Sequence, residues 1–296
     1  MAQCQQGILL EPPKHSRYLS FDCQSGVSTE QIKSTLSDLA ELVDGKEVVL
    51  GIGLSLLNVL GVKIEGLRHL SATSGAGFDI PSTPAALWCW LRGDDPGELY
   101  HRSRRLEEML FPAFSASHVL YGFLYKDSRD LSGYEDGTEN PQGDDAIAAA
   151  IVSGQGNGMD GSSFVAVQQW LHDFDVIQDM EEAEMDDVIG RHISNNEEFD
   201  EAPESAHVKR SAQESFSPEA FILRRSLPWV DGTEAGLNFV AFGQSLDAFE
   251  AILHRMLGRE DGIADALFQI SRPVNGACFW CPPMKQAKLD LSLLGC

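Results

Sequence analysis

Hydrophobic and polar positions along the first half of the chain predict four strands and two helices. Runs rich in β-branched and aromatic residues predict strands at 17–21, 48–53, 85–91 and 119–125. Between the first two runs, apolar positions three or four residues apart follow the capping sequence Ser28-Thr29-Glu30-Gln31 and predict a helix. A second helix is expected after Asp94-Asp95-Pro96, because acidic residues and proline suit a helix start. A Gly/Ser-rich insertion running through 71–78 separates the second and third strands.

The second half of the chain repeats this order. Strands are expected at 163–170, 220–224, 236–242 and 276–281, with helices at about 174–189 and from Ser245 to Gly258. Two successive strand-helix-strand-strand-helix-strand units predict an α+β protein made of two ferredoxin-like halves packed together, in the manner of a dimeric α+β barrel. The expected divisions are 1–130 for the first half, 131–161 for a joining segment, 162–284 for the second half and 285–296 for a short tail.

Charge and composition limit the possible partners and compartments. The formal net charge of the 296 residues is −23, which argues against nucleic acid or an anionic membrane as a partner. No apolar run reaches the roughly 20 residues that cross a bilayer. Residues 1–10 lack the basic start and apolar core of a signal peptide, and the six cysteines are scattered like reduced thiols. A cytoplasmic protein is therefore expected.

One loop in the joining segment has unusual chemistry. In Gly133-Tyr134-Glu135-Asp136-Gly137-Thr138-Glu139-Asn140-Pro141, a short carboxylate lies beside a glycine on a chain that the Asn-Pro pair turns sharply. A surface Asp-Gly turn has the same local features. The position of the loop between the two halves favours a ligand-binding role for Asp136, because ligands often bind at such joints.

Two further positions in the second half are candidates for a site. His207 follows a polar insertion, where it is either a surface histidine or a metal or haem ligand with a carboxylate behind it; Asp265 is one candidate for that carboxylate. Arg224 and Arg225 end an apolar strand, so they are expected on opposite sides of the sheet. One of them can then face a pocket while the other faces water, or both can be solvated at a sheet edge.

Three other motifs match the sequence patterns of known binding sites but lack the structural context that those sites require. The G-x-G-x-x-G of 156–161 precedes a strand, whereas the dinucleotide fingerprint follows a strand and opens a helix. Cys278 and Cys281 lie three apart on a strand and point to opposite faces, so buried free thiols are expected. The acidic run 181–187 lacks the spaced ligands and the glycine of a calcium loop, and we expect a solvated helix face.

Together, the loop 133–141, the downstream His207 and Arg224-Arg225-Ser226-Leu227-Pro228 resemble the dye-decolourising peroxidases. The likeness extends from about residue 7 to residue 283. It implies a haem enzyme of two ferredoxin-like halves with one haem b per chain in the second half. The compact chain is most similar to the bacterial cytosolic branch. The resemblance implies reduction of hydrogen peroxide and, through a ferryl intermediate, oxidation of bulky aromatic or dye-like donors.

The resemblance also implies roles on the proximal side of the haem. His207 would be the ligand of the haem iron, and Asp265 would be the carboxylate that supports it. Arg191 would pair with a haem propionate. Gly137 and Thr138 belong to the loop that would contact the cofactor.

On the distal side, Asp136 and Arg224 would face the peroxide. Arg224 is preferred to Arg225 because the arginine of the family stands two residues before a Ser or Asn; Ser226 would then line the distal pocket. A carboxylate can carry the proton that peroxide cleavage requires, and a guanidinium can stabilise the developing charge. An ordinary aspartate pKa of about 4 permits operation at acidic pH, where we expect the best activity.

Other functions and partners stay open from sequence alone. A non-enzymatic haem-binding or haem-handling protein is the alternative to a peroxidase, and a carboxylate-rich metal protein is a third possibility if the resemblance is set aside. Five tryptophans could relay electrons from surface donors, although core positions are the commoner use. A homodimer or larger assembly is expected. Docking into a protein nanocompartment shell through 285–296 is conceivable, but the tail is short.

Overall fold

The computed structural model describes residues 3–75 and 77–296. Residues 1–2, part of the N-terminal stretch considered above, and residue 76, within the Gly/Ser-rich insertion, lie outside the described residues.

The N-terminal half has the predicted elements. They are β1 (His15–Cys23), α1 (Thr29–Leu42), β2 (Val48–Gly53), β5 (Leu87–Gly93), α3 (Pro96–Leu110) and β6 (Phe114–Phe123). Ser28 and Asp95 cap the two helices by accepting hydrogen bonds from the backbone N–H groups of Gln31 and Glu98. The four strands pair antiparallel in the order β2-β5-β1-β6. The insertion adds α2 (Leu54–Leu60) and the hairpin of β3 (Thr73–Gly75) and β4 (Phe78–Ile80).

The C-terminal half follows α4 (Gly143–Ala150). Its elements are β7 (Ser163–His172), α5 (Phe174–Asp179), α6 (Glu182–Ile189), α7 (His207–Arg210), β8 (Leu223–Arg224), β9 (Leu227–Asp231), β10 (Glu234–Gly243), α8 (Asp247–Met256), β11 (Ser271–Pro273) and β12 (Ala277–Cys281). Its main strands pair antiparallel in the order β12-β7-β10-β9. Numbered within each half, both sets of four therefore have the order fourth, first, third, second.

Two boundaries in the C-terminal half differ from expectation. The run 220–224 contributes only the two-residue β8, and the long second strand is β9, which contains Pro228. Proline normally argues against a strand, but Pro228 stands where only a few pairs link β9 to its neighbours. The expected helix at 174–189 is two helices, interrupted at 180–181, where Glu181 begins a new capping box.

The two sheets join into one barrel. β12 pairs with β2, β6 meets β9 through Gly122 and Trp229, and β7 pairs with β10, so eight strands form a closed ring. The α+β class is confirmed. The barrel interior holds one hydrophobic cluster, and a second cluster lies under the helices outside it. Cys278 belongs to the outer cluster and Cys281 to the inner one, which confirms that they are buried thiols on opposite faces. All five tryptophans are buried.

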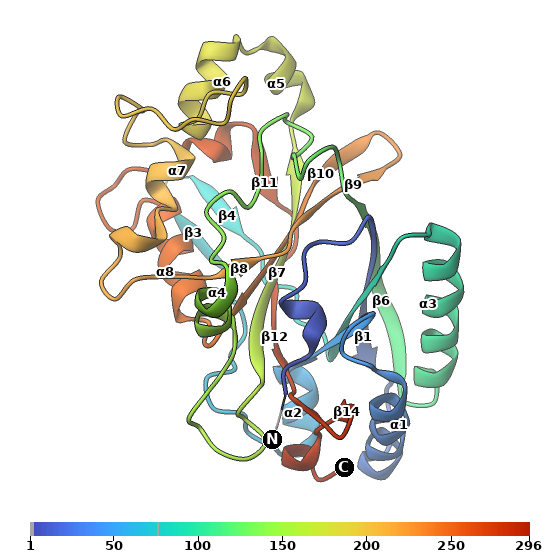
Figure 1. Ribbon diagram of the computed structural model, residues 1–296. Coiled ribbons are helices and arrows are strands. Elements are labelled where there is room, and N and C mark those ends of the chain that lie inside the picture. The colour runs from blue at the N-terminus through green and yellow to red at the C-terminus, as the bar shows by residue number, and fades with distance from the viewer. Residues whose placement is uncertain (1–2, 76) are drawn as a thin grey trace.

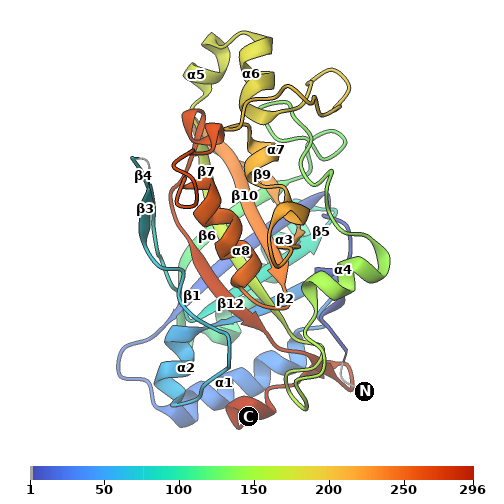
Figure 2. The same cartoon turned by 90° about the vertical axis from the view of Figure 1, so that its left-hand side faces the viewer.

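The helices cover the two sheets differently. In the N-terminal half, α1 and α3 lie side by side along the sheet and bury Leu36, Leu39, Leu99 and Leu106 against it. In the C-terminal half, α8 packs against β10, whereas α5 and α6 stand at one end of the molecule, beyond the strands (Figures 1 and 2). α6 packs instead on a small separate cluster that contains Tyr134, Met185 and Val188.

The segment 285–296 is not a free tail. Met284–Lys285 and Lys288–Leu289 form a small hairpin, β13 and β14, and a 3-10 turn follows at Ser292–Leu294. Leu289, Leu291 and Leu294 are buried in the outer cluster. The packing of these leucines in the outer cluster holds the segment against the rest of the protein. No helix among the described residues is long and apolar enough to cross a membrane.

Candidate functional site

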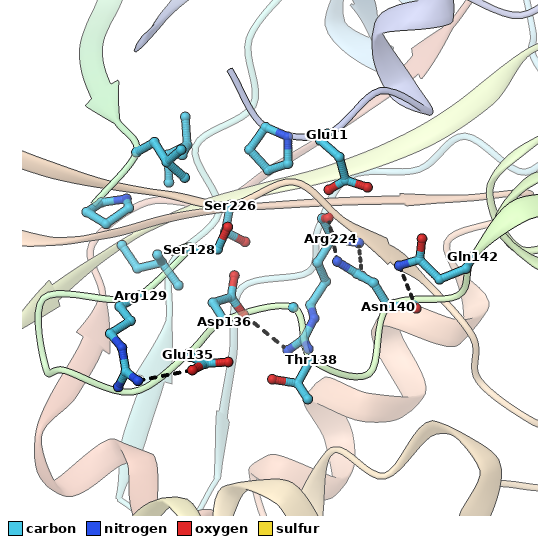
Figure 3. A pocket seen from close by; sticks show the side chains of 16 residues that line it. Glu11, Ser128, Arg129, Glu135, Asp136, Thr138, Asn140, Gln142, Arg224 and Ser226 are labelled. Carbon is cyan, nitrogen blue, oxygen red and sulfur yellow. Dashed lines mark hydrogen bonds and ion pairs between the residues drawn. The ribbon is translucent and has the colours of Figure 1, made fainter. Parts of the chain in front are cut away.

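A cavity of about 220 Å³ lies where the joining loop meets the C-terminal sheet. The loop contributes residues 135–138, the strands contribute Arg224, Ser226 and Leu237, and the N-terminal segment contributes Glu11 and Pro12. Figure 3 shows the polar side chains of this set turned toward a shared space. The loop predicted to carry chemistry is therefore part of a real cavity.

Two glycines allow the loop to take this path. Gly133 has φ of +100°, and a Cβ there would lie 2.9 Å from Cδ1 of Ile193. Gly137 has φ of +84°, and a Cβ there would lie 2.8 Å from Nδ2 of Asn140. Residues other than glycine rarely adopt these backbone angles, and here their Cβ atoms would also collide with neighbouring side chains. Because Gly137 has no side chain, the side chain of Asn140 can pack directly against the backbone of Gly137.

The loop brings Asp136 to Arg224. Oδ1 of Asp136 lies 3.5 Å from Nη1 of Arg224, and the side chains of Asp136 and Arg224 are 22% and 18% exposed. The backbone N–H of Asp136 donates to the carbonyl of Ser128, which fixes the carboxylate on the cavity wall. The Nε of Arg224 is buried and has no hydrogen-bond partner within the described part of the chain. A carboxylate and a guanidinium thus face the same space, and the guanidinium keeps one N–H donor free of any described partner.

Asn140 holds the backbone of Arg224 in place. Its Nδ2 donates to the carbonyl of Arg224 at 3.0 Å, and its Oδ1 accepts from the N–H of Arg224 at 2.8 Å (Figure 3). The amide therefore pairs with β8 as a neighbouring strand would. From sequence, Asn140 is predicted only as a turn residue before Pro141. An Asn-Pro pair is common in turns, so the sequence carries no specific sign of this clamp.

Arg225 points away from the cavity, as alternation predicts, but it does not face water. It is 2% exposed, and its guanidinium donates to the carbonyls of Ile8 and Leu9. Burial lowers its pKa, an effect that the nearby Glu11 opposes. Arg225 therefore ties the N-terminal segment to the sheet. Ser226 is buried and lines the cavity, and its Oγ accepts from the N–H of Val240 at 3.4 Å.

His207 is the first residue of α7 and is bound to a buried carboxylate. Its Nδ1 lies 2.8 Å from Oδ2 of Asp265, whose side chain is completely buried. The other oxygen of Asp265 accepts from the N–H of Leu267 and caps a 3-10 turn, Ala266–Gln269. The imidazole remains 22% exposed, and within the described residues its Nε2 has no hydrogen-bond partner. His207 is not among the residues that line the 220 Å³ cavity.

Arg191 and Thr138 join the loop to the insertion of the second half. Arg191 is buried and donates to Glu139, at 2.7 Å, and to Glu198, at 3.1 Å. Thr138 lines the cavity, and its Oγ1 accepts from Nδ2 of Asn196. The sequence-predicted residues thus fall into three groups: Asp136, Arg224, Ser226, Gly137 and Thr138 at the cavity; His207 and Asp265 as a pair; and Arg191 in an ion-pair cluster.

Asp186, predicted on a solvated helix face, is instead a buried anchor for the loop. It accepts hydrogen bonds from the Tyr134 hydroxyl at 2.6 Å, from Nδ1 of His192 and from the N–H of Ile193. Burial alone would raise the pKa of Asp186, but these bonds outweigh it and the pKa falls. An acidic run does not reveal which of its members a distant tyrosine will cover, so the prediction was wrong at this residue.

A second anchor holds the start of the loop. Asp130 accepts from Nε2 of His172 at 2.9 Å and from the N–H of Ser132, and Nδ1 of His172 lies 2.7 Å from the Ser271 hydroxyl. All three members of this chain, Asp130, His172 and Ser271, are buried. Burial tends to raise the pKa of Asp130. The hydrogen bond and charge of His172, together with the hydrogen bonds from Ser132, outweigh burial and lower the pKa. Carboxylates thus fix the start of the loop, and the Asn140 amide fixes its end.

Comparison with known proteins identifies the family of the chain. The family described as "Dyp-type peroxidase, C-terminal" matches residues 127–286, a span that contains Asp136, His207, Arg224 and Asp265. A dye-decolorizing peroxidase of Rhodococcus erythropolis is 30% identical over 94% of this chain and 86% of its own length. One from Brevibacterium linens is 27% identical over 94% of this chain and 80% of its own length.

Solved structures show the same fold over almost the whole chain. A protein of Shewanella oneidensis described as a DyP-type peroxidase superposes with a TM-score of 0.88 at 27% identity, covering 99% of this chain and 98% of its own. A DypB variant of Rhodococcus jostii RHA1, solved in complex with heme, gives 0.85 at 26% identity over 93% and 94% of the two chains. The chain therefore belongs to the DyP-type peroxidase family and is a dye-decolourising peroxidase.

Proposed function

We propose that this chain binds one haem b in its C-terminal half, reduces hydrogen peroxide and oxidises bulky aromatic donors. The observation that supports this most strongly is the approach of Asp136 to Arg224 at one cavity, in the same half as a histidine backed by a buried carboxylate. Neither pair is close in sequence, and each is brought together by the fold. The heme complex of the Rhodococcus jostii relative supports the choice of cofactor.

The residues present fit a haem. His207 offers Nε2 as an iron ligand while its Nδ1 is bound to Asp265, which is the arrangement common for metal-bound imidazoles. Arg224 offers a buried Nε that no described protein atom satisfies. When bound, the haem would supply the redox-active iron at which peroxide reacts. Gly137 and Thr138 would lie along the cofactor, and Arg191 would bind a propionate by exchanging its contact with the exposed Glu139.

Each protein residue then has a definite task. Asp265 accepts from Nδ1–H of His207, which fixes the tautomer and leaves Nε2 with its lone pair. Asp136 accepts a proton from one oxygen of the bound peroxide at Oδ1 and returns it to the departing oxygen. Arg224, always protonated, stabilises the negative charge that develops as the O–O bond breaks.

An absorption spectrum of haem-reconstituted protein, before and after one equivalent of hydrogen peroxide, tests the proposal. We expect a Soret band that changes within seconds. The haem content of the His207→Ala variant should fall by about tenfold or more, because the bond from His207 to the iron supplies much of the free energy of haem binding. The control is His254→Ala, at an exposed position on α8, which should retain haem normally. Bound haem that does not react with peroxide would instead indicate a haem-handling protein, and absence of haem would contradict the proposal.

We further propose the finer assignments that the family permits. The repeated strand order supports two ferredoxin-like halves at 1–130 and 162–284, joined by 131–161. Six free cysteines support a reducing, cytoplasmic compartment and the bacterial cytosolic branch. A homodimer or larger assembly is proposed by likeness to the family. The packing of Leu289, Leu291 and Leu294 weakens the idea that 285–296 serves as a docking tail for a shell.

A further inference from the structure

The barrel interior contains a second cavity, of about 310 Å³, which is separate from the proposed haem site. Its walls come from both halves: β1, β5 and β6 on one side, and β7, β10 and β12 on the other. Tyr18, Trp88 and Phe279 belong to the inner hydrophobic cluster, whereas Asp22, Ser117 and His118 are exposed, so the cavity opens to solvent. No residue lines both cavities. The volume lies at the lower end of the range of about 300–1,000 Å³ that holds small organic ligands.

Three side chains of this cavity carry polar groups without a partner. The hydroxyl of Tyr18, Nε1 of Trp88 and Nδ2 of Asn238 are buried and make no hydrogen bond to any described part of the protein. The three residues are only 3%, 1% and 2% exposed. A buried donor left unsatisfied destabilises the folded state, so three on one cavity indicate that a bound molecule accepts hydrogen bonds from them.

The chemistry of the walls selects the class of ligand. The rings of Tyr18 and Trp88 are stacked with centroids 6.3 Å apart, and Trp88 is stacked with Phe279 at 6.1 Å, so planar surfaces dominate the apolar part. Burial raises the pKa of Tyr18 to about 12, although the neighbouring polar groups of Ser16 and Asn238, which lie near the hydroxyl without a well-formed hydrogen bond to it, favour the ionised form, so the hydroxyl stays protonated and can donate. Within the described residues, neither lysine nor arginine lines the cavity, whereas the exposed Asp22 does. His118 also lines it, but partial burial, opposed by Gln169, lowers the pKa of its imidazole, so it adds no positive charge at neutral pH. An anionic ligand would therefore be disfavoured.

We propose that this barrel cavity is a binding site for a neutral, planar aromatic molecule that carries a carbonyl or similar hydrogen-bond acceptor. The aromatic body would lie against Trp88 and Phe279, and the acceptor would receive the N–H of Asn238 together with the hydroxyl of Tyr18 or the indole N–H of Trp88. The site is independent of the haem site, because its residues lie on the inner face of the sheets.

The experiment measures binding of 2-acetylnaphthalene, a neutral two-ring aryl ketone, to the full-length haem-loaded protein by equilibrium dialysis. 2-Naphthoate, which has a similar ring system and a negative charge, is the matched control ligand and should bind at least about tenfold more weakly. Asn238→Leu and Tyr18→Phe each remove one donor and should weaken ketone binding by about three- to tenfold. Ala277→Leu should abolish binding, because the added carbons occupy the cavity.

Controls separate this site from the peroxide cavity and from effects on folding. Arg224→Leu should leave ketone binding unchanged, even if the peroxide reaction is lost. Tyr100→Phe, at an exposed tyrosine, and Asn58→Leu, at an exposed asparagine, are the matched controls for the two donor removals. Circular dichroism establishes that each variant is folded. A crystal structure of the wild-type protein with the ketone gives the location whatever the variants do.

Several results would overturn the proposal. Unchanged affinity in folded Asn238→Leu and Tyr18→Phe variants would exclude the predicted contacts. Equal binding of the naphthoate would exclude the selection by charge. Electron density for ordered water alone in the barrel cavity, at saturating ketone, would mean that the three donors are satisfied by solvent and that the cavity is not a ligand site.

Discussion

The two halves of the barrel share a strand order but use it differently. In the N-terminal half, α1 and α3 lie directly on the sheet and bury leucines against its outer face. In the C-terminal half, the chain after β7 leaves the sheet, forms α5 and α6 at one end of the molecule and returns through α7 (Figure 1). The polar residues of the candidate site occur on this returning chain, on β8 and on the joining loop.

The difference shows how a repeated architecture acquires a site. A helix packed along the sheet stabilises the fold by burying apolar area. Where that helix is displaced, the outer face must be covered by something else, and the C-terminal half uses a loop held by buried carboxylates together with the segment of His207. Stability is then expected to depend mainly on the first half, and the peroxide reaction on the second. Four predictions test this separation.

The largest effect is expected when the cavity pair is removed. Arg224→Leu and Asp136→Ala should each slow the reaction with peroxide by about 10²–10³-fold, because one loses charge stabilisation and the other the proton carrier. Haem content should stay close to that of the wild type. Stopped-flow absorbance gives the rate. Arg104→Leu on α3 and Asp144→Ala at the start of α4, both exposed, are the matched controls. A rate within twofold of wild type in either cavity variant would remove that residue from the mechanism.

The sequence anticipates more of the architecture than of the site. Strand order and most helices follow from hydrophobic spacing, because each element carries its own pattern. The displacement of α5 and α6 could not be predicted from local pattern. Their apolar faces pack against Tyr134 and neighbouring residues that are distant in sequence. The resemblance to a family drew attention to Asp136, Arg224 and His207. The clamp of Asn140 has no local sequence pattern, because an amide pairing with a distant backbone depends on the fold.

A change in the core of the N-terminal half should affect stability alone. Leu36 of α1 is completely buried, and Leu36→Ala should lower the free energy of unfolding by about 3 kcal/mol through the cavity it creates. The rate with peroxide should remain that of the wild type. Urea unfolding and stopped-flow absorbance provide the two measurements. Leu42→Ala, on the same helix but 48% exposed, should change stability by less than about 0.5 kcal/mol. A slowed peroxide reaction in folded Leu36→Ala would break the proposed division of labour.

Asn140→Ala joins the two properties within the C-terminal half. It removes both hydrogen bonds to the backbone of Arg224, and the N–H and carbonyl left behind are partly buried. We expect a loss of about 2 kcal/mol in stability and a peroxide rate about tenfold lower, because Arg224 is no longer held opposite Asp136. Asn58→Ala on α2 is the exposed control. If stability falls while the rate stays constant, Asn140 has a structural role only.

The smallest effect tests whether the loop is held by charge. The pKa of Asp130 is lowered below its ordinary 3.8, so the folded state binds its proton less readily than the unfolded chain. The resulting stabilisation is complete above about pH 5 and is lost as the pH falls through 3.8 toward the folded pKa. Asp130→Asn keeps an acceptor for His172 but removes the charge. Its unfolding free energy should be about 1 kcal/mol below wild type at pH 6.

The dependence of that gap on pH, rather than its size, is decisive. Urea unfolding between pH 3 and 7 should show the difference between wild type and Asp130→Asn shrinking at the acidic end, whereas Asp144→Asn, at an exposed carboxylate, should give no such convergence. A gap that stays constant over this range would mean that Asp130 stabilises the loop through hydrogen-bond geometry alone. In that case the loop would depend on packing, as the N-terminal half does, and the contrast in how the two halves are held together would disappear.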